Sequence, residues 1–125
     1  MDTQTNAHPN LFSGDNELMK IDVYLDAKFG QRSMEAITLM ADIAELKKML
    51  TEEIVHFVFE KTDGSRRDAY GTRAVDVIRR YDTATANQRP QRAFSGTFPY
   101  FDIEKQEWRC FKVDRFVMID KDYTL

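Results

Sequence analysis

The stretch that decides the fold is IVHFVFEKTDGSRRDAYGT, residues 54–72. Its apolar side chains recur at every second position: Val55, Phe57 and Phe59. This period is typical of a strand with one buried face. The dipeptide Asp63-Gly64 then interrupts the pattern, and such pairs favour two-residue hairpin turns because they tolerate positive φ angles. The stretch therefore predicts a β-hairpin in which residues 54–60 pair with residues 66–72.

A second aromatic stretch, FPYFDIEKQEWRCFKVDRFVMI, occupies residues 98–119. It predicts three more strands, at 98–103, 108–113 and 115–119. Together with the first hairpin this makes five short strands, which can remove their exposed edges by curling into a small barrel. Gly71 and Gly96 are candidates for the bends or bulges that such curling needs.

One amphipathic helix is expected before the barrel, over MEAITLMADIAELKKML, residues 34–50. Its apolar side chains recur at three- and four-residue steps: Met34, Ile37, Met40, Ile43, Leu46 and Leu50. Ser33 is a suitable N-cap, because its hydroxyl can accept from a free N–H of the first turn. The apolar stripe needs a partner, which is either the barrel or another subunit.

The predicted fold class is therefore mainly β (α+β), a five-stranded small barrel preceded by an amphipathic helix. We expect an N-terminal arm over residues 1–32, one domain over 33–121 and a tail over 122–125. Within the arm, residues 17–29 fit a helix and a strand equally well. Between the hairpins, residues 74–81 predict a short helical turn, followed by a flexible loop over 82–97. The turn is expected to direct these side chains inward: Val75, Ile78 and Tyr81.

Composition restricts the class of protein. The chain has 125 residues, of which 42% are hydrophobic, enough for one packed domain. No apolar run reaches the length of a membrane span, and the polar first residues do not resemble a secretory signal. The single Cys110 excludes an internal disulfide and suits a reducing cytoplasm. A cytoplasmic location is therefore expected.

Charge is unevenly distributed around a net value of −3. Residues 1–60 contain 5 Lys or Arg against 11 Asp or Glu, a balance of −6, whereas residues 61–115 contain 12 against 8, a balance of +4. A basic second half suits an anionic partner. A solvated surface of mixed charge is the alternative interpretation.

Signals for catalysis are missing. The chain has only two histidines, His8 and His56, and no cluster with metal-ligand spacing. Cys110 has no recognisable companion base, and no phosphate-binding glycine motif occurs. The carboxylates of the second hairpin are best explained as solvated charge: Asp102, Glu104, Glu107 and Asp114. The sequence therefore predicts a non-enzymatic protein without a cofactor, in which His56 is an ordinary outward strand residue.

Strand alternation in the second hairpin predicts a binding surface. If Phe111 faces the core, Trp108 and Lys112 decorate the outside. Across the turn, Phe101 is expected inward, with Tyr100 and Asp102 outward. An exposed Trp108 beside Tyr100 and Lys112 would suit single-stranded nucleic acid, for which base–aromatic stacking contributes about 1–3 kcal/mol per base. The alternative is that Trp108 covers the helix over 34–50.

A basic cluster is expected on the same hairpin, from Arg109, Lys112 and Arg115. Arg89 and Arg92 of the long loop are candidates to join it. Arginine favours phosphate and carboxylate partners through its planar guanidinium. Neighbouring acids oppose this interpretation because they can neutralise the cluster within the protein: Asp102, Glu107 and Asp114.

Both hairpins resemble a known family. The segment 54–72 is similar to the first hairpin of the WYL-like family of Sm-like, SH3-type barrels, found in Bacteroidetes, their phages and mobile elements. The matching positions are Val55, Phe57, Phe59, Lys61, Asp63, Gly64, Ser65, Arg67, Ala69, Gly71 and Thr72. The segment 100–119 resembles the closing hairpin of WYL-type domains. Its matching positions are Trp108, Arg109, Phe111, Lys112, Val113, Asp114, Arg115 and Phe116.

The resemblance covers roughly residues 42–119 and implies an Sm-like barrel. In larger WYL proteins such a barrel senses a ligand or nucleic acid, which by analogy makes Arg109, Lys112 and Arg115 candidate contacts. The WYL tripeptide itself is absent, and FPYF at 98–101 stands near its place.

Two functions follow from the sequence as hypotheses. The first is a module that binds an anionic ligand, single-stranded nucleic acid or a nucleotide, through the second hairpin and the loop over 82–97. The second is a structural or protein-interaction module that forms a homo-oligomer or binds a host or phage protein through the helix over 34–50 and the barrel edges.

Overall fold

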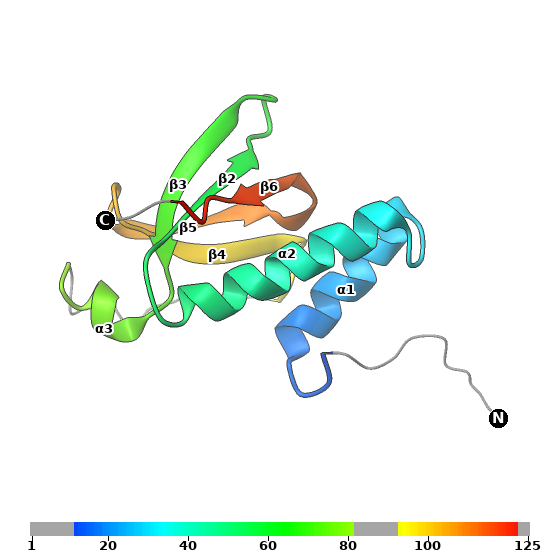
Figure 1. Cartoon of the computed structure of the whole chain (residues 1–125), viewed down its shortest axis with the longest axis horizontal. Helices are drawn as coiled ribbons and strands as arrows, with labels where there is room; N and C mark the ends of the chain where they lie inside the picture. Colours follow the sequence, from blue (N-terminus) through cyan, green and yellow to red (C-terminus); the bar gives the residue numbers. More distant parts are fainter. Residues whose placement is uncertain (1–11, 82–92, 123–125) are drawn as a thin grey trace.

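A computed structural model describes residues 12–81 and 93–122 (Figure 1). The helices in this part of the chain are α1 (Asn16–Phe29), α2 (Met34–Leu50), α3 (Val75–Ile78) and the 3-10 turn η1 (Val113–Arg115). The strands are β2 (Val55–Glu60), β3 (Arg66–Thr72), β4 (Thr97–Asp102), β5 (Glu107–Lys112) and β6 (Phe116–Ile119). They form one five-stranded antiparallel sheet in the order β5-β4-β3-β2-β6. The expected five strands are thus confirmed.

Aromatic side chains roll the sheet into a barrel. Phe111 of β5 stacks on Phe59 of β2 with ring centroids 5.3 Å apart, although two strands separate them in the sheet order. Phe57, which is fully buried, lies 5.6 Å from Phe111 and 6.2 Å from Phe116. The two hairpins therefore enclose one core, as a small barrel requires.

The first hairpin has the predicted strand pairing, but its turn is one residue longer than predicted. Phe57 pairs with Ala69, and the inward residues of β2 are buried. Gly64 has a φ of +90°, and the amide of Lys61 donates to the carbonyl of Ser65 at 2.7 Å. The chain turns at Asp63-Gly64 as predicted, but the loop has three residues, from Thr62 to Gly64, instead of the predicted two. Only Gly64 has a positive φ there, which a residue without a Cβ adopts at no cost.

The helix over 34–50 is confirmed as α2. The Ser33 hydroxyl accepts from the amide of Ala36 at 3.1 Å, which is the predicted N-cap. Most of its apolar stripe is buried against the barrel and α1, but Met34 is 76% and Ile37 44% exposed. These two lie in the first turn, and the rest of the stripe is already covered within this chain.

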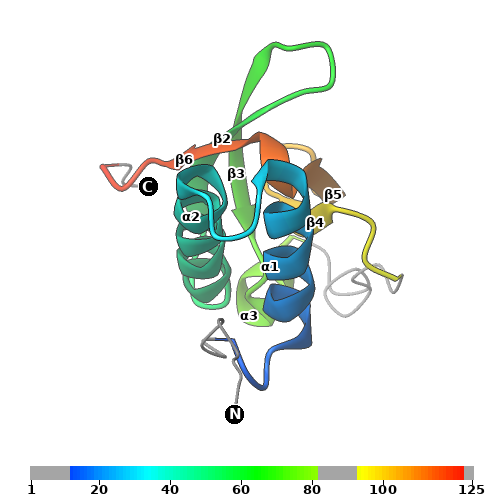
Figure 2. The same ribbon diagram turned by 90° about the vertical axis from the view of Figure 1, so that its right-hand side faces the viewer.

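Residues 17–29, whose sequence fits a helix and a strand equally well, form a helix. Asp15 caps α1 by accepting from the amide of Leu18 at 3.0 Å. Leu18, Ile21 and Leu25 lie in the same core cluster as the barrel. Both long helices lie on one side of the barrel, side by side (Figure 2).

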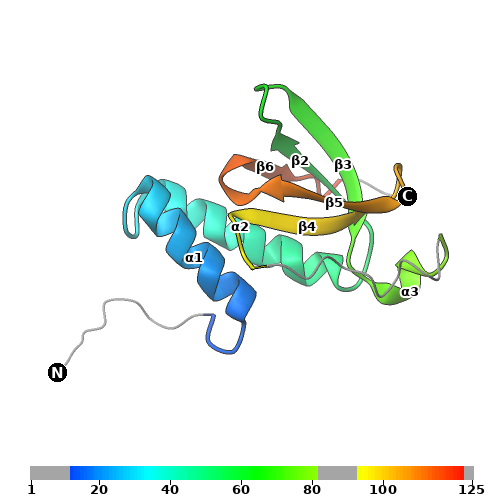
Figure 3. The same ribbon diagram turned by 180° about the vertical axis from the view of Figure 1, so that it is seen from behind.

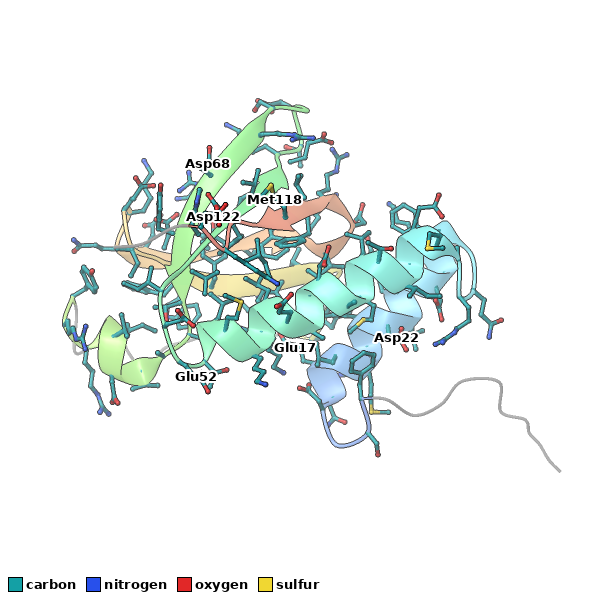
Figure 4. The ribbon with its side chains drawn as sticks, in the orientation of Figure 1. Glu17, Asp22, Glu52, Asp68, Met118 and Asp122 are labelled. Carbon is teal, nitrogen blue, oxygen red and sulfur yellow. The ribbon has the colours of Figure 1, made fainter. Side chains whose placement is uncertain are left out.

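A buried ionic network fixes the helices to the barrel. Arg73 follows β3, and its guanidinium donates to both carboxylate oxygens of Glu17 on α1 at 2.8 Å. The same guanidinium donates to the carbonyl of Pro99 at 2.9 Å and lies 3.8 Å above the ring of Phe98. Lys47 of α2 contacts Glu17 at 2.9 Å. Four chain segments therefore meet at one arginine; the labelled Glu17 can be followed in Figure 4.

The same network determines the protonation state of Glu17. Burial alone would raise the pKa of Glu17, but hydrogen bonds and positive charge from Arg73 and Lys47 outweigh it and lower the pKa to about 2. Glu17 is therefore ionised near neutral pH, and its charge is matched inside the protein.

Gly71 lets β3 approach the core. A Cβ at this position would lie 2.6 Å from Cδ2 of Tyr100 and 3.1 Å from Cε1 of Phe57. Both rings belong to residues that are fully buried, so neither can move aside without disturbing the core. Gly71 is thus needed for close approach rather than for its backbone angle.

We expect Gly71→Ala to lower the free energy of unfolding by about 1–3 kcal/mol, the usual cost of overpacking. Urea denaturation followed by circular dichroism measures it. In a Tyr100→Leu background the same change should cost less than half as much, because the closest clashing ring is gone. An equal cost in both backgrounds would contradict this explanation.

The turn after β3 differs in part from its prediction. It forms α3, in which Ile78 is fully buried as expected. Val75 is 38% and Tyr81 39% exposed, so the expectation that they face inward is wrong. Val77 is buried instead, because the helical turn ends at Ile78 and does not carry the periodicity on to Tyr81.

Candidate functional site

Tyr100 is buried and not exposed, so its expected outward position is wrong. The β4–β5 register pairs Phe98 with Phe111, which puts Phe98 and Tyr100 on the core face. The ring of Tyr100 packs against Phe57 at 5.1 Å. Burial, and then the negative charge of Asp102, raises the pKa of Tyr100 to about 12. Its ring face is not available for stacking with a base.

Asp102 is also buried, contrary to its expected outward position. It shares the core face with Tyr100, is fully inaccessible, and pairs with the guanidinium of Arg67. It also accepts from the amide of Lys105 at 2.9 Å. This carboxylate is therefore part of the internal structure, not of a solvated hairpin surface.

Trp108 belongs to a second, smaller core. It is half-buried, and its ring meets the fully buried Phe101 edge-on at 6.1 Å. Ile78 of α3 completes this cluster. Trp108 therefore packs beside α3, whereas the sequence placed it either free on the surface or over α2. The position of Trp108 differs from its prediction because Phe101 lies on the outer face of β4 and not on the face toward the barrel core.

Arg109 is separated from the other basic residues. It pairs in register with Tyr100, near the start of β5, and its guanidinium contacts Glu107 at 2.7 Å. Lys112 ends β5 on the other face of the strand, and Arg115 lies beyond it in η1. The single cluster expected from Arg109, Lys112 and Arg115 is thus divided.

Basic residues also occur where the first hairpin turns and where β5 ends, a region that we term the turn end. It is defined by Lys61, Arg66, Lys112 and Arg115. There β2 ends, β3 begins, and η1 leads from β5 into β6 (Figure 3). Arg115 contacts Glu60 at 3.0 Å and also reaches the carbonyl of Lys61, so the two hairpins meet at this end.

The acids of the turn end are all engaged. Glu60 pairs with Arg115, and Asp63 accepts from the amide and hydroxyl of Ser65. These bonds, with a smaller contribution from Lys61, lower the pKa of Asp63. Asp114 is 7% exposed and lies between the Tyr24 hydroxyl and Lys28.

Three cations of the turn end have no ion-pair partner among the described acids, although Lys61 acts on Asp63 from a longer distance. Within residues 12–81 and 93–122, no carboxylate lies within ion-pair distance of these side chains: Lys61, Arg66 and Lys112. All three are exposed. Sequence reasoning missed Lys61 and Arg66, although both flank the Asp63-Gly64 turn, which necessarily projects into solvent.

Comparison with known proteins fits this architecture. Residues 43–117 match the family described as WYL_2, Sm-like SH3 beta-barrel fold. The chain belongs to the WYL_2 family. It is also 31% identical over 75 residues to the uncharacterized 11.5 kDa protein in the Gp31-cd intergenic region of Enterobacteria phage T4. The aligned residues make up 60% of this chain and 74% of the phage protein. No solved structure matches.

The WYL_2 match leaves the N-terminal helix aside. It begins inside α2 and ends in β6, and therefore covers the turn end but not α1. The predicted resemblance over residues 42–119 is confirmed almost to its limits. Arg89 and Arg92, the remaining predicted contacts, lie outside the described residues.

The side chain of His56 in the WYL_2 barrel contacts two acids and a tyrosine ring. Its Nδ1 lies 2.9 Å from Asp120 and its Nε2 3.0 Å from Asp68, and the ring stacks on Tyr70 at 4.6 Å. It projects outward from β2, as predicted, and joins the chain after β6 to β3. Within the described ranges no group of histidine, cysteine and acidic side chains is arranged to hold a metal ion. No helix in those ranges is long and apolar enough to cross a membrane.

Proposed function

We propose that this WYL_2 chain is a non-enzymatic module that binds an anionic ligand, single-stranded nucleic acid or a nucleotide, at the turn end of its barrel. One observation carries the proposal: three exposed cations, two from the first hairpin and one from the end of β5, have no ion-pair partner among the described acids, while every acid among the described residues of that end is engaged. Such a surface keeps a positive potential that attracts phosphate. Lys112 and Arg115 were predicted as contacts, and Lys61 and Arg66 join them.

The environment of the aromatic residues supports contacts to phosphate more than contacts to bases. Tyr100 is fully buried and Trp108 packs on Phe101, so neither offers a free ring face at the turn end. Phosphate contacts position a nucleic acid but carry no sequence information. Binding is therefore expected to depend little on base sequence and strongly on salt.

The test is a titration of fluorescently labelled oligo(dT) at several salt concentrations. Three phosphate contacts at about −0.7 each predict a slope of log K against log salt of about −2. Arg66→Glu and Lys112→Glu should each weaken binding at least about tenfold. Lys48→Glu, an equal charge change on an exposed part of α2, should leave it within about twofold. Competition with ATP distinguishes a nucleotide site from one that needs a strand.

Two outcomes would overturn the proposal. One is the absence of binding at about 20 mM salt, where counterion release favours association most. The other is an equal loss of affinity in Lys48→Glu and Arg66→Glu, because binding would then follow net charge and not the turn end.

A protein-interaction module is the second candidate. The expected surface was the helix over 34–50, but most of its stripe is buried. Exposed apolar side chains remain on both long helices: Met34 (76%) and Ile37 (44%) in the first turn of α2, and Val23 (70%) and Met19 (37%) on α1.

A further inference from the structure

An apolar groove runs along the outer face of α1. Its volume is about 560 Å³. The lining residues are Asn16, Met19, Lys20, Val23, Tyr24 and Phe94. Four of them recur on α1 at the i, i+3, i+4 and i+7 positions of a helical stripe, and this stripe points away from the core that Ile21 and Leu25 enter. The five lining residues of α1 lie outside the part of the chain that matches WYL_2, and only Phe94 lies within it.

The wall of the groove is fixed in place. Tyr24 donates its hydroxyl to Asp114 at 3.1 Å and meets the ring of Phe94 edge-on at 5.7 Å. Gly96 lies directly beneath it: a Cβ there would be 2.9 Å from the Tyr24 ring. The groove is therefore preformed, which reduces the ordering cost of binding.

Positive charge borders the groove on one flank. Lys20, Tyr24 and Lys28 follow one another at four-residue steps along α1. No described carboxylate pairs with Lys20, and Lys28 shares Asp114 with Tyr24 while remaining 48% exposed. Asp22 and Asp26 lie on the opposite flank, at the same spacing.

We infer that this groove is a docking site for an amphipathic helix of a partner protein, with apolar anchors at helical spacing and acidic residues beside them. The anchors fill the space between Val23 and Phe94, and the acids meet Lys20 and Lys28. This mode of recognition places one apolar helix face in a groove. A second copy of this chain in an antiparallel two-fold contact fits less well, because that arrangement brings the same lysine flank against itself.

The experiment uses the full chain as bait for a displayed library of random peptides of about 14 residues, enough for four helical turns. We expect enrichment of peptides with apolar residues at three- and four-residue steps and Asp or Glu next to them. One enriched peptide is then synthesised, and its affinity is measured by fluorescence anisotropy beside a scrambled version of the same composition.

Substitutions in the groove locate the site. Val23→Glu, at a largely exposed position, should weaken binding at least about tenfold, and Lys20→Glu should weaken it and shift the preference toward basic peptides. Met118→Glu is the matched control: Met118 is 46% exposed on β6, away from α1, and the change should have no effect (Figure 4). The turn-end variant Arg66→Glu should also bind the peptide normally, which separates this site from the anion site.

Three results would overturn the inference: no enriched motif, equal binding of the scrambled peptide, or a loss in Met118→Glu equal to that in Val23→Glu. Sedimentation of the free chain tests the other occupant. A dimer that Val23→Glu dissociates would mean that a second copy covers the groove instead of a partner helix.

Discussion

Replacement of Arg73 by Met is expected to lower the free energy of unfolding by about 3–5 kcal/mol. The side chain is only 6% exposed and holds Glu17 by two hydrogen bonds of 2.8 Å. Met retains much of the apolar packing on Phe98 but leaves the Glu17 carboxylate partly buried with Lys47 as its remaining cation. Loss of one partner of a buried pair costs more than the pair itself contributes, because the other charge stays desolvated. Urea denaturation gives the value.

Arg79→Met is the control for Arg73→Met. Arg79 faces Asp76 at 4.0 Å, with side chains 52% and 92% exposed, so its loss should cost no more than about 0.5 kcal/mol. The double variant Arg73→Met/Glu17→Gln should recover part of the loss, since no buried charge is then abandoned. A cost for Arg73→Met no greater than that of Arg79→Met would show that the pair does not hold the helices.

Acid should weaken the same contact. The pKa of Glu17 is lower in the folded protein, about 2, than its ordinary value of 4.5. The stabilisation is therefore complete above pH 4.5 and is lost as pH falls toward 2. The difference between these two pKa values corresponds to at most about 3 kcal/mol in the free energy of unfolding. Because the carboxylate is 18% exposed and partly screened by solvent, we expect about 2 kcal/mol.

Comparison of the wild type with Glu17→Gln isolates this effect, since all other carboxylates are common to both. The wild type should be the more stable above pH 4.5, and the two free energies of unfolding should converge near pH 2. Curves that stay parallel over this range would show that Glu17 does not carry the difference.

Local patterns predicted the strands well. The period-two stretch of β2 and the Asp63-Gly64 turn determine the first hairpin, and both act over a few neighbouring residues. The N-cap at Ser33 is equally local. These features are visible in the sequence because each depends on neighbouring residues in the chain.

The faces of β4 could not be predicted in the same way. FPYFD offers apolar residues to both sides, so alternation alone does not decide whether Tyr100 or Phe101 enters the barrel. The decision rests on the register with Phe111 and on the second core that Ile78 and Trp108 provide on the outer side. Both are long-range contacts, and the assignment of Tyr100 and Asp102 to the surface was wrong for this reason.

The basic site could be predicted only in part, for a similar reason. Sequence reasoning grouped Arg109 with Arg115 because they are close in the chain. The fold gives each its own acid, Glu107 or Glu60, and brings Arg66 from the other hairpin instead. Which cations stay free depends on which acids are engaged, and ion pairs between distant segments cannot be read from spacing.

The network around Arg73 also determines how this protein can be shortened. A fragment that kept only the WYL_2 match would lack Glu17, the carboxylate to which both Arg73 and Lys47 are bound. The two cations would then sit at the barrel wall with no counter-charge, beside a core no longer covered by Leu18, Ile21 and Leu25. Isolation of the family domain by trimming at its boundary should therefore yield an unstable, aggregating product, and useful expression fragments should retain the chain from Phe12 onward.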